Sequence, residues 1–214
     1  MIPVQIKSAH DLAVGGEAVP FALERRDTTT ALSIDGREIP IAAYEGAPLE
    51  VIARSIARVP SPLRALLSRI VISLEANPKD AAWSQTYGLP VLAGMGAVGS
   101  GRITIYPHGI DQLALPDGED VFVRNLMHEL GHCWSLADWT RQPSDQEAWV
   151  RAIASDPSAP SQLAALSFRN SGLPYEDAAE ATALYFLVRG APSFDAYRAA
   201  MPARFALLAA RFSG

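Results

Sequence analysis

The sequence feature that most constrains this chain is a pair of histidines four residues apart, His128 and His132, with Glu129 between them. The flanking apolar residues recur at helical spacing without a proline, which predicts that both histidines lie on one helix. Four residues of α-helix give about 400° of rotation and a rise of about 6 Å, so both imidazoles project from the same face. Two such nitrogens suit a tetrahedral zinc ion, which binds histidine nitrogen at about 2.0–2.1 Å. Glu129 is too close in sequence to join that geometry, but it can reach a zinc-bound water and act as its general base. The alternative is a pair of core histidines satisfied by hydrogen bonds.

A catalytic zinc site needs a third protein ligand and an open fourth position, and the sequence offers two candidates for the ligand. Asp138 lies six residues after His132, as in proteases whose helix breaks at once, but Ser135 stands where those proteases have a glycine. Glu176 lies further along, on the same face of a predicted helix as Glu180. Two carboxylates on one face of an apolar helix favour Glu176 as the ligand and Glu180 as the hydrogen-bond partner of a ligand histidine. Asp138 remains the alternative ligand, and a solvated helix start remains the alternative role of the two glutamates.

Composition limits the classes of protein to which the chain can belong. With 214 residues, 49% of them apolar, it can bury a core of ordinary size. The net charge of −5 excludes a generally basic nucleic-acid binder, and no apolar run approaches the roughly 20 residues that span a bilayer. The first 20 residues lack the order of a secretory signal, and the single Cys133, interpreted as a core residue, permits no internal disulfide. We therefore expect a cytoplasmic protein, or one exported without a cleavable N-terminal signal, that binds no nucleic acid.

The order of the elements predicts an α+β protein with a small mixed β-sheet and a mainly helical C-terminal half. Residues 30–41 are typical of a hairpin, because Asp35-Gly36 accepts the positive φ angles of a tight turn. Pro40 in the second arm indicates an edge strand. We divide the chain into an N-terminal β-rich appendage, residues 1–45, and a main domain, residues 46–214.

Further strands are expected at residues 69–74 and 102–106, with a long irregular loop over 75–101 between them. Gly94 to Gly99 matches a dinucleotide-binding pattern as text, but a strand rather than a helix follows it, so we reject that interpretation. Helices are predicted over residues 49–59, 63–67, 121–134, 144–154 and 174–188, with a C-terminal tail of one or two helices broken near Pro202.

The histidine motif and the acidic segment Glu176–Glu180 together resemble the catalytic domain of anthrax lethal factor and the Pro-Pro endopeptidases, which are small zinc peptidases of the gluzincin type. Residues 60–73 resemble the helix and first core strand of that family, and residues 101–106 resemble its edge strand. The resemblance covers roughly residues 49–188. It implies a zincin-like catalytic domain in residues 46–214, with zinc held by the histidine pair and the first glutamate of the acidic segment.

One position departs from the pattern of that family. The family usually has a tyrosine seven residues before its third ligand, and the tyrosine hydroxyl stabilises the oxyanion that develops during hydrolysis. Arg169 stands at this position, and its guanidinium could serve the same electrostatic role as a catalytic group. Alternatively, Arg169 is a surface residue, and Tyr175 or Tyr185 replaces the missing tyrosine.

The sequence thus predicts a zinc-dependent metallopeptidase. Zinc would lower the pKa of a bound water towards about 7, and Glu129 would take the proton of that water as it attacks a peptide carbonyl. The protein or peptide substrate would lie extended along residues 102–106 as an added strand. Two alternatives use the same residues: a zinc-binding interaction module without oxyanion stabilisation, and a zinc hydrolase that acts on a non-peptide amide or ester. An Arg169 that points into a cleft favours an enzyme, whereas an Arg169 in solvent favours the module or a replacement tyrosine.

Overall fold

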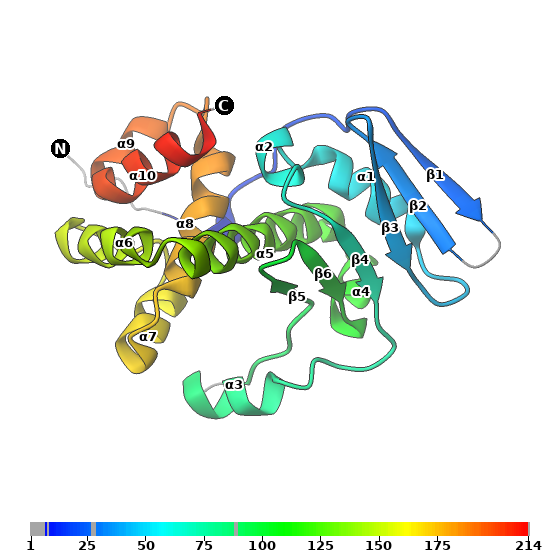
Figure 1. Cartoon of the computed structure of the whole chain (residues 1–214), viewed down its shortest axis with the longest axis horizontal. Helices are drawn as coiled ribbons and strands as arrows, with labels where there is room; N and C mark the ends of the chain where they lie inside the picture. The colour runs from blue at the N-terminus through cyan, green and yellow to red at the C-terminus, as the bar shows by residue number, and fades with distance from the viewer. Residues whose placement is uncertain (1–6, 8, 27–28, 88–89, 214) are drawn as a thin grey trace.

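A six-stranded mixed sheet and a mainly helical C-terminal half make up the computed structural model, which describes residues 7, 9–26, 29–87 and 90–213 (Figure 1). The strand order is β1-β2-β3-β4-β6-β5. Strands β1, β2 and β3 pair antiparallel, β3, β4 and β6 run parallel, and β5 is antiparallel to β6. The strands are Phe21–Arg26 (β1), Thr29–Ile34 (β2), Arg37–Ala42 (β3), Arg69–Ile72 (β4), Met95–Val98 (β5) and Arg102–Ile105 (β6).

The hairpin predicted around Asp35-Gly36 is confirmed, since β2 and β3 flank it and both turn residues have positive φ, 52° and 69°. The prediction of an edge strand at Pro40 is wrong, because β3 lies between β2 and β4. Proline is tolerated there because β3 pairs with β4 only through Ile41 and Ala42, after the proline. Residues 21–42 therefore form half of one continuous sheet. The division of the chain into an appendage, residues 1–45, and a main domain, residues 46–214, stays a prediction.

Helices form most of the remaining chain, and among the described residues none is long and apolar enough to cross a bilayer. Their bounds are Ala9–Asp11 (η1, a 3-10 turn), Leu49–Arg58 (α1), Ser61–Arg64 (α2), Asp80–Tyr87 (α3), Pro107–Gln112 (α4), Gly118–Arg141 (α5), Pro143–Ser155 (α6), Gln162–Ser171 (α7), Tyr175–Val188 (α8), Phe194–Ala200 (α9) and Pro202–Phe212 (α10). The helices predicted over 49–59, 144–154 and 174–188, and the break near Pro202, are confirmed.

Several of the predicted element bounds are wrong. The helix predicted over residues 63–67 is α2, which begins at Ser61 and ends at Arg64. Residues 75–101 contain α3 and β5 rather than one irregular loop. The two glycines in and next to β5, Gly94 and Gly96, weakened the strand signal in the sequence. The helix predicted over 121–134 begins three residues earlier, at Gly118, and continues to Arg141, because no proline follows until Pro143.

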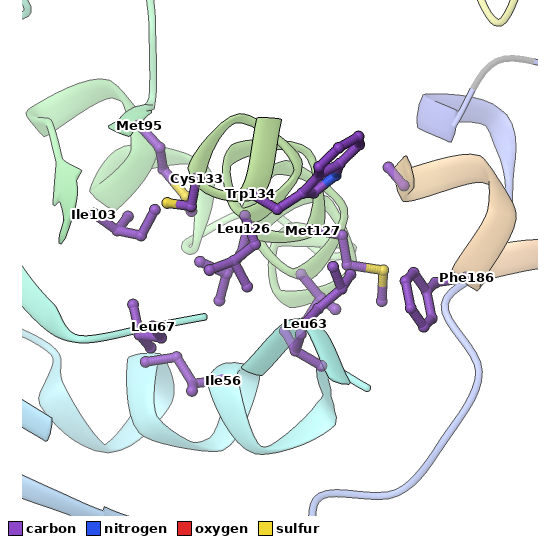
Figure 2. Close-up of a cluster of buried hydrophobic side chains, with 14 of the residues drawn as sticks. Ile56, Leu63, Leu67, Met95, Ile103, Leu126, Met127, Cys133, Trp134 and Phe186 are labelled. Atoms are coloured by element: carbon purple, nitrogen blue, oxygen red, sulfur yellow. The ribbon is translucent and has the colours of Figure 1, made fainter. Parts of the chain in front are cut away.

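Helix α5 lies at the centre of the molecule, between the sheet and α8 (Figure 1). Its apolar side chains meet those of α1, α2 and the sheet in one buried cluster (Figure 2), which includes Ile56, Leu63, Leu67, Met95, Ile103, Leu126, Met127, Cys133, Trp134 and Phe186. Burial raises the pKa of the Cys133 thiol to about 12, in keeping with a core residue. Helix α8 is buried along almost its whole length from Asp177 to Val188, with α5, α7, α9 and α10 packed against it. Polar side chains in this buried stretch, such as Asp177 and Glu180, are therefore held away from bulk water.

Candidate metal centre

Helix α5 presents His128 and His132 on one face, and α8 brings Glu176 to them. The distance from His128 Nε2 to Glu176 Oε2 is 3.4 Å, and the distance from His132 Nε2 to Glu176 Oε1 is also 3.4 Å. The two imidazole rings lie 4.8 Å apart, almost perpendicular to one another. One ligand atom from each of the three residues lies within 4.8 Å of the others. The structure thus brings together the three side chains that the sequence proposed as zinc ligands.

The spacing of these three side chains fits a tetrahedral zinc ion. Two ligands bound to zinc at about 2.0–2.1 Å, with a tetrahedral angle between them, lie about 3.3–3.4 Å apart. Each histidine nitrogen lies at about this distance from a different oxygen of Glu176, His128 from Oε2 and His132 from Oε1. The side chains of His128, His132 and Glu176 are 17%, 13% and 26% exposed, so the centre is sheltered but open on one side. Two imidazoles, one carboxylate and an open position make up the donor set of many catalytic zinc sites.

Glu180 determines which nitrogen of His128 faces Glu176. Its Oε2 lies 3.1 Å from His128 Nδ1, and its side chain is only 4% exposed. An Nδ1–H that donates to this carboxylate leaves the lone pair of Nε2 for a metal ion. Glu180 therefore occupies the place that the sequence proposed for the hydrogen-bond partner of a ligand histidine.

Burial, neighbouring charges and hydrogen bonds shift the pKa values of His128, Glu176 and Glu129. Burial alone lowers the pKa of His128, but its hydrogen bonds with Glu176 and Glu180 outweigh burial and hold that pKa well above its usual value. Burial raises the pKa of Glu176, but the charges and hydrogen bonds of His132 and His128 outweigh it and hold that pKa well below the usual range. For Glu129, burial is the largest effect and raises its pKa. The centre concentrates negative charge around two nitrogens, which a bound cation would neutralise.

The position of Glu176 depends on a very close approach between α5 and α8. A Cβ atom at Gly131 would lie 2.7 Å from the Cα of Ala179 and 3.0 Å from its carbonyl oxygen, so only glycine fits between the helices. One turn further along, Trp134 Nε1 donates a hydrogen bond of 3.0 Å to Thr182 Oγ1. Helix α8 is therefore fixed against the helix that carries the two histidines.

The first turn of α8 is also anchored from its other side. Asp177 accepts hydrogen bonds from Arg204 Nε at 2.7 Å, Arg204 Nη2 at 2.8 Å and Trp149 Nε1 at 2.9 Å. Arg204 donates in addition to Asp156 at 3.0 Å, and the side chains of this network are almost completely buried. A bidentate buried pair has a defined orientation, so the C-terminal helices hold the backbone next to Glu176.

Asp138, the alternative third ligand, is kept away from the histidines because α5 does not break. Six residues of continuous helix place its side chain about 120° around the helix axis from that of His132. Asp138 instead accepts a hydrogen bond of 2.6 Å from Arg211 Nε. Of the two candidates, only Glu176 belongs to the group around the histidines.

The candidate metal centre opens into a cavity of about 1560 Å³, lined by Glu129 as well as by the three candidate ligands. One wall is formed by β5, β6 and the segment that precedes β5, and the opposite wall by α7 and the segment that precedes it. Six large apolar residues of the described chain are exposed, and four of them line this cavity: Leu92, Val98, Leu163 and Leu173. Exposed apolar side chains that gather on one concavity are typical of a binding site.

The free sheet edge beside this cavity is β5, so the prediction of an edge strand at residues 102–106 is wrong. β6 pairs with β4 on one side and with β5 on the other. Gly94 and Val98 accept main-chain hydrogen bonds from the β6 side. Because bonded and open positions alternate along an antiparallel strand, the N–H and C=O groups of Met95 and Ala97 face the open edge.

Arg169 does not reach the cavity. Its side chain is exposed on α7, and it is not among the described residues that line the cavity. Tyr185, one of the proposed replacements, is buried against Phe186, Phe194 and Phe205. Tyr175, the other, does line the cavity, with its ring 5.2 Å from that of Trp139. The structure therefore does not support the role that the family pattern suggested for Arg169.

Tyr106 also lines the cavity, and sequence reasoning missed it as a functional candidate. Its ring packs over Gly96 of the edge strand. Burial raises the pKa of Tyr106, and the negative charge of Glu129 raises it further. The phenol therefore keeps its proton, as a hydrogen-bond donor must, and lies within electrostatic range of Glu129. Tyr106 follows β6 directly and lines the same cavity as the histidines, and no spacing in the sequence indicates this.

Comparisons of this chain with protein-family models, with curated proteins and with solved structures gave no match. A proposal about function therefore rests on the geometry of the centre and its cavity.

Proposed function

We propose that this protein is a zinc-dependent peptidase of the gluzincin type that its motifs resemble. The observation that carries the proposal is the close group of His128, His132 and Glu176, with Glu129 beside it in the same cavity. Bound zinc would supply Lewis-acid chemistry, polarising a carbonyl and lowering the pKa of a water towards about 7.

Three residues around the centre would have the remaining roles in catalysis. Glu129 would take the proton of the attacking water, and its raised pKa makes it a better proton acceptor than a solvated carboxylate. Glu180 would hold His128 with Nε2 towards the centre. Tyr106 would donate a hydrogen bond to the oxyanion that develops on the substrate carbonyl, in place of Arg169.

The substrate would be a peptide segment in extended conformation with large apolar side chains. The open N–H and C=O groups of Met95 and Ala97 can pair with such a segment as an added strand. The exposed apolar residues on the two walls, such as Leu92 and Leu163, would cover the side chains of the segment on either side of the cleaved bond.

The experiment that tests the proposal compares the wild-type chain with Glu129→Gln. Protein purified without chelator should contain about one equivalent of zinc, and mass spectrometry of a mixed peptide library should identify cleaved products. Glu129→Gln should keep the zinc but cleave about a hundred- to ten-thousandfold more slowly, because an amide cannot accept the proton of the water. Glu147→Gln, at an exposed glutamate on α6, is the matched control and should behave as wild type.

Each of the other outcomes contradicts part of the proposal. A chain without zinc, even after zinc is added, contradicts the metal site, and cleavage by Glu129→Gln at the wild-type rate contradicts the role of Glu129. Zinc binding without hydrolysis of any substrate would instead support an interaction module, which the exposed Arg169 favours. Hydrolysis of esters or small amides alone would support a non-peptide hydrolase.

A further inference from the structure

We propose that the N-terminal segment around Ala9 is a brace for the metal ligand His128, and that its main chain acts through Glu180. The inference rests on the proposed zinc site, since it concerns what holds one of the ligands in place. It makes the N–H of Ala9 a positioning group, although Ala9 is far from the histidine motif in the sequence.

The two oxygens of the Glu180 carboxylate contact different parts of the chain. Oε2 lies 3.1 Å from His128 Nδ1, and Oε1 accepts a hydrogen bond of 3.3 Å from the main-chain N–H of Ala9. Ala9 is 2% exposed and Glu180 is 3% exposed, so water does not compete for these contacts. A buried carboxylate held at both oxygens keeps one orientation, and so does the imidazole that it contacts.

The segment that carries Ala9 is fixed on both sides of it. Before Ala9, the main chain of Lys7 exchanges two hydrogen bonds with the hydroxyl of Tyr197 on α9, at 3.0 and 3.1 Å. After it, the carbonyl oxygen of Leu12 accepts a hydrogen bond of 2.7 Å from Arg124 Nη1. Side chains from α9 and α5 thus hold the segment that contains η1, on the side of Glu180 that faces away from His128.

Arg124 makes this arrangement a closed ring of contacts. It lies one turn before His128 on α5, so the two side chains share a face of that helix. Arg124 holds Leu12, η1 connects Leu12 to Ala9, Ala9 holds Glu180, and Glu180 holds His128. Any change that releases the segment would therefore loosen the imidazole.

The variant that tests the brace is Ala9→Pro, which removes the N–H and keeps the side chain small. Proline is tolerated at the first position of a helical turn, so η1 can still form. Ala9→Gly keeps the N–H and is the matched control. The zinc dissociation constant of each folded full-length chain would be measured by competition with a chromophoric chelator.

We expect Ala9→Pro to weaken zinc binding about tenfold, the lower end of the range for groups that orient a metal ligand, and Ala9→Gly to bind zinc as wild type does. In a Glu180→Ala background, Ala9→Pro should cause no further loss, because the carboxylate through which Ala9 acts is gone. If circular dichroism shows that Ala9→Pro does not fold, Arg124→Leu releases Leu12 instead and should show the same dependence on Glu180.

Two results overturn the brace while the zinc site stands. One is a folded Ala9→Pro chain with the zinc affinity of wild type. The other is an equal loss of affinity with and without Glu180, which would mean that the segment acts on the centre by another route. A wild-type chain that binds no zinc would overturn the proposed function itself, and the brace with it.

Discussion

The two halves of the proposed metal centre differ in how the chain builds them. Helix α5 supplies His128, Glu129 and His132 from five consecutive residues, and ordinary helix geometry places the two histidines on one face. Helix α8 supplies Glu176 and Glu180, which reach the histidines only because the two helices pack at close range. The α5 half is a property of the local sequence, whereas the α8 half depends on tertiary contacts that extend to the N-terminal segment and to α10. Substitutions that leave α5 unchanged should therefore still be able to dismantle the centre.

The largest effect should come from removing the ligand that α8 contributes. Glu176→Ala leaves both histidines in place, but it should weaken zinc binding by more than about a hundredfold, beyond the usual loss for groups that only orient a ligand. Chelator competition measures this change.

Asp138→Ala is the control on the α5 side of the comparison. It removes a carboxylate that the sequence allowed as a ligand and that the structure pairs with Arg211. This partly exposed pair contributes at most about 1 kcal/mol to the free energy of unfolding, and zinc affinity should stay unchanged. Loss of zinc in Asp138→Ala with zinc retained in Glu176→Ala would reverse the assignment of the third ligand.

The sequence alone predicts the α5 half of the site better than the α8 half. The α5 half of the centre follows from the spacing of four residues between His128 and His132. The hairpin at Asp35-Gly36 follows from the φ angles that its turn requires. Glu176 and Glu180 could be proposed because two acids on one face of an apolar helix need an explanation. The length of α5 decided against Asp138, but it could be judged only once the helix was seen to continue beyond the histidines.

Some positions depend on tertiary structure, and no pattern in the sequence indicates how they are placed. Counting back from Glu176 led to Arg169, but the count cannot show which way α7 turns its side chains, and this one is exposed. The edge strand β5 resembles a loop in the sequence, because it contains a glycine, which is uncommon inside strands. Missing β5 also concealed Tyr106, whose ring lies over Gly96 of that strand.

The second largest effect should show whether Tyr106 or Arg169 stabilises the oxyanion. Arg169 is the candidate from sequence spacing, and Tyr106 is the candidate from the structure. Tyr106→Phe removes one hydrogen-bond donor from the cavity, and the loss of an oxyanion donor typically lowers turnover by about a hundred- to a thousandfold. Arg169→Ala should leave turnover unchanged, because its guanidinium lies outside the cavity. The measurement is kcat on a peptide that the wild-type chain cleaves, with zinc content checked for each variant. A large loss in Arg169→Ala and none in Tyr106→Phe would restore the family pattern.

The smallest of these effects tests the contact between the two halves directly. Gly131→Ala adds a Cβ that would lie 2.7 Å from the Cα of Ala179, a main-chain atom that cannot rotate away. Alanine is preferred to glycine in a helix by up to about 1 kcal/mol, but overpacking of this kind costs about 1–3 kcal/mol. The free energy of unfolding should therefore fall, as measured by urea denaturation of the zinc-free chain.

Zinc affinity should fall in the same variant, by about tenfold, because separating α5 from α8 moves Glu176 away from histidines that are themselves unchanged. Gly15→Ala is the matched control, since its added Cβ meets no atom within 4 Å, and it should bind zinc as wild type does. If Gly131→Ala were destabilised yet bound zinc with the wild-type affinity, the α8 half would not depend on the close approach of the helices. The anchor between Asp177 and Arg204 at the start of α8 would then have to hold Glu176 by itself.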